Sequence, residues 1–245
     1  MPDLALWQWF VLILASVLVG YSKPAINGVG SIAVILFAAA LPAKASTGTL
    51  LPLLIAADIT AIWAYRRHAD WTLIRRLLPW ILGGIAVGAV FVARVDNHAM
   101  RIAIAVVVLT LLALQVWDRR RPKTERPVPH HVLGPAAGTA TGFTTMVANA
   151  AGPITTLYLL VSGYAVMELV GAAAWLYFVI NLVKLPVSIG LGLVHPGSLL
   201  LDLTPLPAMA AGAWVGVVTI RRVTQAQFER YVLALVAVSA LLLLV

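Results

Sequence analysis

The chain has 245 residues, of which 62% are hydrophobic and only 11% are charged. A water-soluble domain of this length cannot bury so much apolar surface, because its outer shell has to face water. The formal net charge is +8, but the basic residues cluster in short loops between apolar segments, which is typical of a membrane protein and not of a nucleic-acid-binding one.

Hydropathy divides the chain into about ten apolar segments, and we therefore predict an all-α polytopic membrane protein. Helices are expected because the bilayer offers no hydrogen-bond partner to exposed backbone groups, and about 20 helical residues span a ~30 Å hydrocarbon core. The first segment is predicted to be a membrane element, because Met1-Pro2-Asp3-Leu4 lacks the positive start of a signal peptide. The segments lie near residues 5–21, 26–41, 46–65, 72–93, 99–117, 132–147, 150–164, 167–189, 203–220 and 227–245.

A basic, proline-containing stretch at 118–131 divides the chain near its middle and is predicted to be a cytoplasmic linker. It would separate a first membrane repeat, 1–117, from a second, 132–245. Shifting the second half onto the first by 122, 123 or 128 residues superposes many glycine and polar residues. Five segments per half is an odd number, so we predict two repeats of inverted orientation. The superposed pairs include Gly20 with Gly142, Asn27 with Asn149, Gly48 with Gly171, Asp58 with Asn181, Gly84 with Gly212 and Gly88 with Gly216.

The distribution of Lys and Arg predicts the orientation. With the N-terminus outside, twelve of the seventeen face the cytoplasm, and the opposite orientation would reverse this bias. We therefore predict a multi-pass protein of the bacterial inner membrane with both termini outside, the linker inside and the loop around His195 outside. The twelve are Arg66, Arg67, Arg75, Arg76, Arg119, Arg120, Arg121, Lys123, Arg126, Arg221, Arg222 and Arg230.

The first two segments of each half are short and meet at polar or glycine-rich turns, at 20–31 and 142–153. Such pairs, whether half-helices or re-entrant hairpins, indicate the binding site of a transporter. Helix N-termini and a lysine at this depth favour an anion. The alternative is that the glycines are packing contacts and that Lys23 extends to the membrane interface. The predicted substrate-binding residues are Ser22, Lys23, Asn27, Gly28, Gly30, Thr145, Asn149 and Gly152.

Asp58 lies within an apolar segment, where an ionised carboxylate is costly and a functional role is the default hypothesis. It could pair with a cation, carry a coupling proton or line the transport pathway, and Asn181 is its uncharged counterpart; the alternative is a structural cap or ion pair. Lys184 lies on the same helical face as Asn181 but is expected to snorkel to the interface. A bound anion is the expected charge partner of Lys23, because the nearest acidic residues in sequence, Asp3 and Asp58, lie in other elements.

The sequence offers no catalytic or metal-binding constellation. Its five histidines fall in or beside loops, without a facing pair at metal-ligand spacing, and none is placed to serve as the base for a nucleophile. The absence of cysteine excludes disulfides, thiolate metal sites and a cysteine nucleophile. Walker and dinucleotide-binding glycine motifs are also missing. We therefore expect no enzymatic activity, no cofactor, no resident metal and no nucleotide-driven pumping.

Short motifs recur in order along the chain, in the turns and at the starts of later segments. They are Asn27-Gly28-Val29-Gly30, Ala45-Ser46-Thr47-Gly48-Thr49 and Arg66-Arg67-His68-Ala69-Asp70-Trp71 in the first half, and Asn149-Ala150-Ala151-Gly152-Pro153 and Gly171-Ala172-Ala173 in the second. Through these motifs the chain, from about Leu14 to Leu242, resembles the sulfite exporter TauE/SafE family, also called the toluene sulfonate uptake permease family.

The resemblance implies a secondary carrier that exports or takes up small anions, typically sulfur-containing ones such as sulfite or organosulfonates. Our leading hypothesis adds the proton gradient as a candidate driving force. The expected partners are a small anionic substrate, protons and the lipid bilayer, and no nucleic acid. Two alternatives stay open: a carrier of carboxylates or another small solute, and a membrane scaffold subunit without transport of its own. Buried polar residues at matched positions in both halves favour transport over a scaffold.

Overall fold

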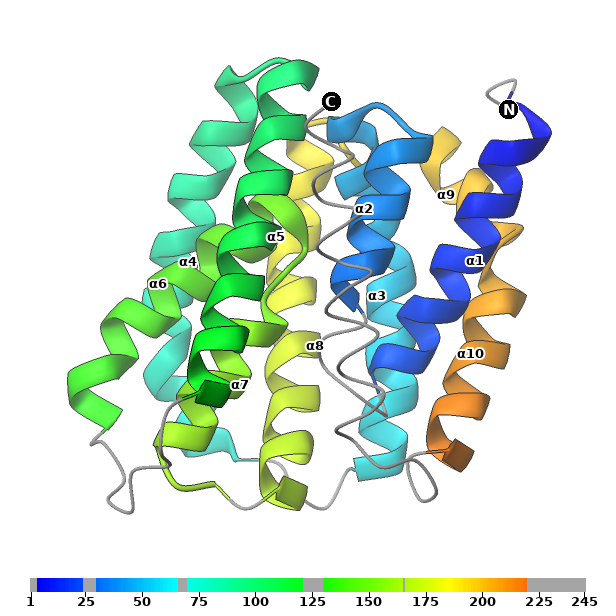
Figure 1. Ribbon diagram of the computed structural model, residues 1–245. Coiled ribbons are helices and arrows are strands. Elements are labelled where there is room, and N and C mark those ends of the chain that lie inside the picture. The colour runs from blue at the N-terminus through cyan, green and yellow to red at the C-terminus, as the bar shows by residue number, and fades with distance from the viewer. Residues whose placement is uncertain (1–3, 24–29, 66–69, 121–129, 165, 220–245) are drawn as a thin grey trace.

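The structure is a computed structural model that describes residues 4–23, 30–65, 70–120, 130–164 and 166–219, and every regular element in these ranges is an α-helix (Figure 1). Within them, four helices are long and apolar enough to cross a membrane, namely α3, α4, α5 and α8, and the bent pair α9 and α10 makes a fifth if it counts as one span. The predicted all-α polytopic fold is thereby confirmed. The helices are α1 (Leu6–Ser22), α2 (Gly30–Ala40), α3 (Ala43–Tyr65), α4 (Trp71–Arg94), α5 (Asn97–Arg120), α6 (His130–Ala148), α7 (Gly152–Val161), α8 (Val166–Gly190), α9 (Pro196–Leu203) and α10 (Leu206–Thr219).

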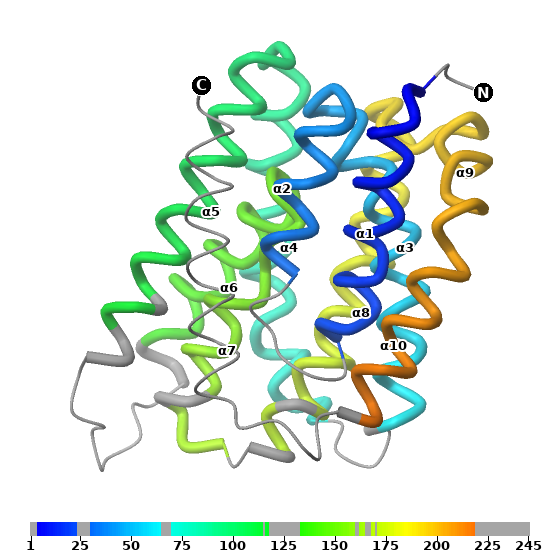
Figure 2. The backbone as a smooth tube through the Cα atoms, turned by 45° about the vertical axis from the view of Figure 1, so that its right-hand side comes forward, coloured from blue at the N-terminus to red at the C-terminus, as the bar shows by residue number. Residues whose placement is uncertain are grey.

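The short helices form two antiparallel pairs, α1 with α2 and α6 with α7. The start of α1 lies beside the end of α2, because Gln8 Nε2 donates a hydrogen bond of 2.6 Å to the Ala40 carbonyl. At the other end of the bundle, the residue Tyr164, just after α7, donates through its hydroxyl to Asp70 at the start of α4, at 2.5 Å. Figures 1 and 2 show that the first pair enters the bundle from the upper end and the second from the lower end.

The Tyr164 contact lies at the lower end of the bundle, outside the helices. Asp70 also caps α4, because its Oδ1 accepts a hydrogen bond of 2.9 Å from the Leu73 N–H. Burial, followed by the neighbouring Asp70 carboxylate, raises the pKa of the Tyr164 phenol above its ordinary value. The phenol therefore stays protonated, and it ties the second short pair to the start of α4.

Two helix pairs from opposite halves, α1 with α10 and α4 with α6, pack with their backbones in direct contact. A Cβ atom placed on Gly20 would lie 1.9 Å from the Met209 carbonyl oxygen, and one on Gly142 would lie 2.1 Å from the Ile81 carbonyl oxygen. No side chain fits in so short a distance. Gly20 and Gly142 are therefore packing contacts between helices, as the alternative interpretation of the sequence stated for the glycines of the turns.

These contacts come in pairs related by the sequence offsets. A Cβ atom placed on Gly84 would lie 2.1 Å from the Thr139 carbonyl oxygen, and one placed on Gly212 would lie 2.1 Å from the Val17 carbonyl oxygen. Adding 128 to Gly84 gives Gly212, and adding 122 to Val17 gives Thr139. Likewise, adding 122 to Gly20 gives Gly142, and adding 128 to Ile81 gives Met209. The contact of Gly20 with Met209 therefore corresponds to the contact of Gly142 with Ile81. This correspondence supports a duplicated chain in which the first helix of each half packs on the other half; the inverted repeat stays a prediction.

Two boundaries differ from the prediction. Helix α5 continues to Arg120, so residues 118–120 of the predicted linker are helical, and arginine has a high intrinsic helix propensity. The ninth segment begins earlier, as α9 at Pro196, and turns by 55° into α10 at Thr204-Pro205, because proline cannot donate the next helical hydrogen bond. The tenth segment, near 227–245, and most of the linker lie outside the described residues.

The arrangement of the loops makes the topology testable. The turn before α9 lies at the same end as the start of α1, whereas α5 ends and α6 begins at the other end (Figure 1). We expect His195→Cys to react with an impermeant thiol reagent in intact cells and Lys123→Cys to react only after permeabilisation, because the chain has no other cysteine. The cysteine-free parent is the control. The reverse pattern of labelling would contradict the predicted orientation.

Candidate functional site

The two short pairs meet α3 and α8 at a cavity in the centre of the bundle, with a volume of about 50 Å³. The cavity is also lined by apolar and aromatic side chains of the long helices, among them Leu54, Tyr177 and Ile180. Of the ten residues predicted for binding or coupling, seven line it: Ser22, Lys23, Gly30, Thr145, Asn149, Gly152 and Asn181. Asn27 and Gly28 lie outside the described residues. The structure thus brings residues from both predicted turns to one place.

The break between α6 and α7 is formed by Asn149. Its φ is 50°, in the left-handed region, and its N–H donates a hydrogen bond of 3.0 Å to the Thr145 carbonyl. This is the αL type of helix end, in which asparagine is tolerated better than most residues. The chain therefore turns sharply at the depth of the cavity.

The N-terminal end of α7 lies against the cavity, where Ala151, Gly152 and Pro153 line it. The first bond of this helix runs from the Thr155 N–H to the Ala151 carbonyl, at 3.2 Å. The N–H groups of Gly152 and Ile154 precede that bond and have no acceptor within the helix, while proline in the first turn lacks an N–H to satisfy. The end of α7 therefore presents partial positive charge to the cavity.

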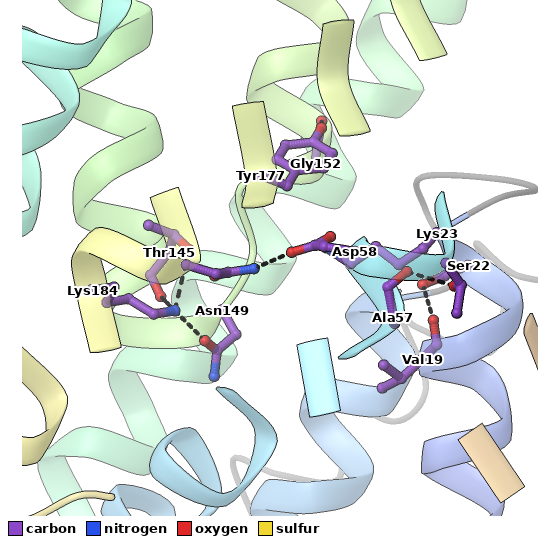
Figure 3. Close-up of polar contacts among 12 residues, drawn as sticks. Val19, Ser22, Lys23, Ala57, Asp58, Thr145, Asn149, Gly152, Tyr177 and Lys184 are labelled. Carbon is purple, nitrogen blue, oxygen red and sulfur yellow. Dashed lines mark hydrogen bonds and ion pairs between the residues drawn. The ribbon is translucent and has the colours of Figure 1, made fainter. Parts of the chain in front are cut away.

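Lys23 and Asp58 form a buried ion pair across α1 and α3 (Figure 3). Lys23 Nζ lies 2.6 Å from Asp58 Oδ1, and Asn181 Nδ2 donates a bond of 2.7 Å to Asp58 Oδ2. Lys23 Nζ also lies 4.9 Å from the centre of the Tyr177 ring, a cation–π distance. The expectation that Asp58 does not reach Lys23 was therefore wrong, because the bundle brings the two side chains together. That Lys23 also contacts a bound anion stays a prediction. The matched residues Asp58 and Asn181 contact each other directly.

Lys184 on α8 is a member of the site that sequence reasoning missed. Its side chain is only 1% exposed, so the expectation that it snorkels was wrong. Lys184 Nζ donates to the Thr145 carbonyl at 2.9 Å, to Thr145 Oγ1 at 3.4 Å and to Asn149 Oδ1 (Figure 3). The available signal was its position three residues after Asn181, which places both side chains on one helical face.

Two of the predicted hydrogen-bond donors are already engaged. Ser22 Oγ donates to the Val19 carbonyl at 2.9 Å, and Asn149 Nδ2 donates to the Thr47 carbonyl at 3.0 Å. Asn149 thus joins α3 to α8, because its amide oxygen accepts from Lys184 while its amide nitrogen donates to α3. The side chain positions the turn and retains one amide hydrogen for a ligand.

Comparison with known proteins gives one match. A family model described as "Sulfite exporter TauE/SafE" matches residues 12–243, nearly the whole chain. No curated protein and no solved structure matches the chain significantly. Over the ranges that the structure describes, no group of three or more His, Asp or Glu side chains is placed to hold a metal ion.

Proposed function

Because the chain belongs to the sulfite exporter TauE/SafE family, we propose that it is a secondary transporter that carries a small sulfur-containing anion, such as sulfite or an organosulfonate, across the bacterial inner membrane. Family membership establishes the coarser statement, a multi-pass membrane transporter of the sulfite-exporter type. The substrate class and its coupling to protons are the finer parts of the proposal.

The observation that carries the proposal is an excess of buried positive charge around the cavity. Lys23 lines the cavity, whereas Lys184 and Asp58 lie behind the lining and contact residues that form it. The Lys23 side chain is 12% exposed, Lys184 is 1% exposed and Asp58 is 0% exposed. Among the described residues, Asp58 is the carboxylate that interacts with these two lysines, so two positive groups share one negative group. A buried charge is costly unless it is paired, and the direct partners of Lys184 there are neutral oxygens. A bound anion would balance this charge, and the free N–H groups at the start of α7 would donate to its oxygens.

The size of the cavity supports a small substrate. A water molecule requires roughly 10–15 Å³ of such space, so a cavity of about 50 Å³ has room for a few waters or for an anion of comparable size. Apolar walls formed by Leu54 and Ile180 suit the less strongly hydrated anions and the short apolar group of a sulfonate.

A binding screen on the purified protein tests the proposal. We expect sulfite, thiosulfate or methanesulfonate to raise the unfolding temperature, because a ligand at about 100 times its Kd adds about 2.7 kcal/mol to the stability of the folded state. Counterflow of the stabilising anion in proteoliposomes should then demonstrate transport. Stabilisation by carboxylates alone would favour the carboxylate carrier, and neither stabilisation nor counterflow would favour the scaffold subunit.

Coupling to protons leads to a separate prediction. Asp58→Asn preserves the size of the side chain but cannot take up a proton, so this variant should insert and retain anion counterflow while losing uptake driven by a pH gradient. Lys23 keeps its contact with Tyr177 and some access to water, which limits the loss of stability. The measurement is uptake into proteoliposomes with and without an imposed pH gradient.

Asp96→Asn is the matched control for this prediction, since Asp96 is an exposed carboxylate that caps α5 and is remote from the cavity. It should leave gradient-driven uptake unchanged. Gradient-driven uptake by Asp58→Asn at the wild-type rate would refute the coupling role. A variant that does not accumulate in the membrane would instead indicate a structural role for Asp58.

A further inference from the structure

The charged groups at the cavity form a small, closed set. In the described residues, the charged or titratable side chains that interact with Asp58 are Lys23 at the C-cap of α1 and Lys184 and Tyr177 on α8. Asp202 on α9, the helix that packs against α3 from the other side, is not among them. Tyr177 is a neutral phenol whose hydroxyl donates to the Gly152 carbonyl. The charge of the site is therefore determined by two lysines and one carboxylate.

The hydrogen bonds indicate the charge state of each group. Asp58 Oδ1 lies in an ion pair with Lys23 Nζ, and Asp58 Oδ2 accepts a hydrogen bond from the Asn181 amide, which is the environment of an ionised carboxylate. Lys184 Nζ lies within hydrogen-bond distance of three oxygens, an arrangement that accommodates an ammonium group, and we take it as charged. Together, the two lysines and the Asp58 carboxylate therefore carry one net positive charge.

This charge restricts which anions the site can hold. An anion with one negative charge brings the buried site to neutrality. An anion with two would leave an uncompensated negative charge beside Asp58, at a depth where burial makes such a charge costly. A proton on Asp58 removes this penalty and also releases Lys23 from its ion pair, so that the charges of the two lysines balance the two negative charges of the anion.

We infer that Asp58 selects substrates by charge: with Asp58 ionised, the site accepts an anion with a single negative charge, and it accepts an anion with two only together with a proton on Asp58. The inference rests on the proposed transport of anions by this site. Bisulfite and sulfonates are the sulfur oxyanions that fit the first state, and sulfite and thiosulfate are those that need the second. In either state, the loaded site is neutral.

Two probes of similar shape separate these states. Methanesulfonate carries one negative charge and sulfate two, and neither changes its charge between about pH 6 and pH 8. We expect wild-type protein to bind methanesulfonate with little dependence on pH. Sulfate should bind more weakly at the higher pH, and its affinity should rise by up to about tenfold for each unit that the pH is lowered, since one proton binds with it. Binding is measured by titration calorimetry on the purified protein.

Two variants move the site charge in opposite directions. Asp58→Asn raises it by one unit, so sulfate should bind at least about tenfold more tightly than to wild type at the higher pH, with no dependence on pH. Lys184→Gln lowers it by one unit, so methanesulfonate should bind at least about tenfold more weakly. Asp96→Asn and Lys44→Gln are the matched controls, because they change the same residue types away from the cavity, and both should titrate like wild type.

The outcomes distinguish the inference from the proposed function. If folded wild-type protein binds neither probe nor any other small anion, the proposed anion site is wrong and the inference fails with it. If wild type binds both probes, but sulfate binding does not change with pH and Asp58→Asn does not alter the preference between them, the inference alone is overturned. The wild-type titrations require no substitution, so misfolding of a variant cannot obscure this result.

Discussion

Replacing Lys23 with glutamine is expected to lower the free energy of unfolding by about 3–5 kcal/mol, because it leaves the Asp58 carboxylate fully buried without its charged partner. The same change removes a positive charge from the cavity, so anion binding should weaken by about tenfold or more. Thermal unfolding of the purified protein in detergent and a binding titration measure the two effects separately.

The double variant, Lys23→Gln with Asp58→Asn, provides the test of the ion pair. It removes both charges and retains two polar side chains, so most of the lost stability should return. The control Lys44→Gln should change little, because Lys44 is half-buried and forms no ion pair within the described residues. If Lys23→Gln alone were as stable as wild type, the buried ion pair between Lys23 and Asp58 would be contradicted. Lys23 would then be accessible to water, as the snorkelling alternative stated.

Replacing Gly84 with alanine is expected to lower the free energy of unfolding by about 3 kcal/mol or more, whereas the same replacement at the neighbouring Gly83 should leave the stability unchanged or raise it. A Cβ atom on Gly84 would lie 2.1 Å from the Thr139 carbonyl oxygen, a backbone atom that cannot move without separating α4 from α6. On Gly83 it would meet nothing within 4 Å, and alanine favours a helix over glycine by about 1 kcal/mol.

Gly84→Ala and Gly83→Ala form a closely matched pair, since they make the same chemical change at successive positions of one helix. Unfolding temperature and the yield of monodisperse protein are the measurements. Because Gly142 makes the same kind of contact with α4, Gly142→Ala should behave like Gly84→Ala. Equal stability of the Gly83 and Gly84 variants would mean that the backbones of α4 and α6 are farther apart.

Much of this fold could be predicted because apolar blocks, prolines and glycines report directly on membrane helices and their ends. The two short pairs were predictable for the same reason, and their turns contained most of the residues that line the cavity. The start of the ninth segment was harder to predict, because the stretch between Pro196 and Pro205 contains an apolar run of only three leucines, which is too short to indicate a membrane helix.

The contacts between elements could not be derived from one sequence. Asp58 follows Lys23 by many residues, and only the packing of α3 beside α1 brings them together. Lys184 lies near the end of an apolar segment, where hydropathy predicts snorkelling, but α8 turns this face toward the break at Asn149. Hydropathy describes depth in the membrane, whereas burial also depends on which way a helix is rotated.

The exchange of helices between the halves has a mechanical consequence. Helix α1 of the first half is fixed to α10, and α6 of the second half to α4, at glycines that leave no room for sliding. A rigid-body motion that widened the cavity would therefore not separate residues 1–117 from residues 132–245. It would divide the molecule into two mixed bodies, each built from both halves of the chain, and neither half expressed alone would contain a complete moving part.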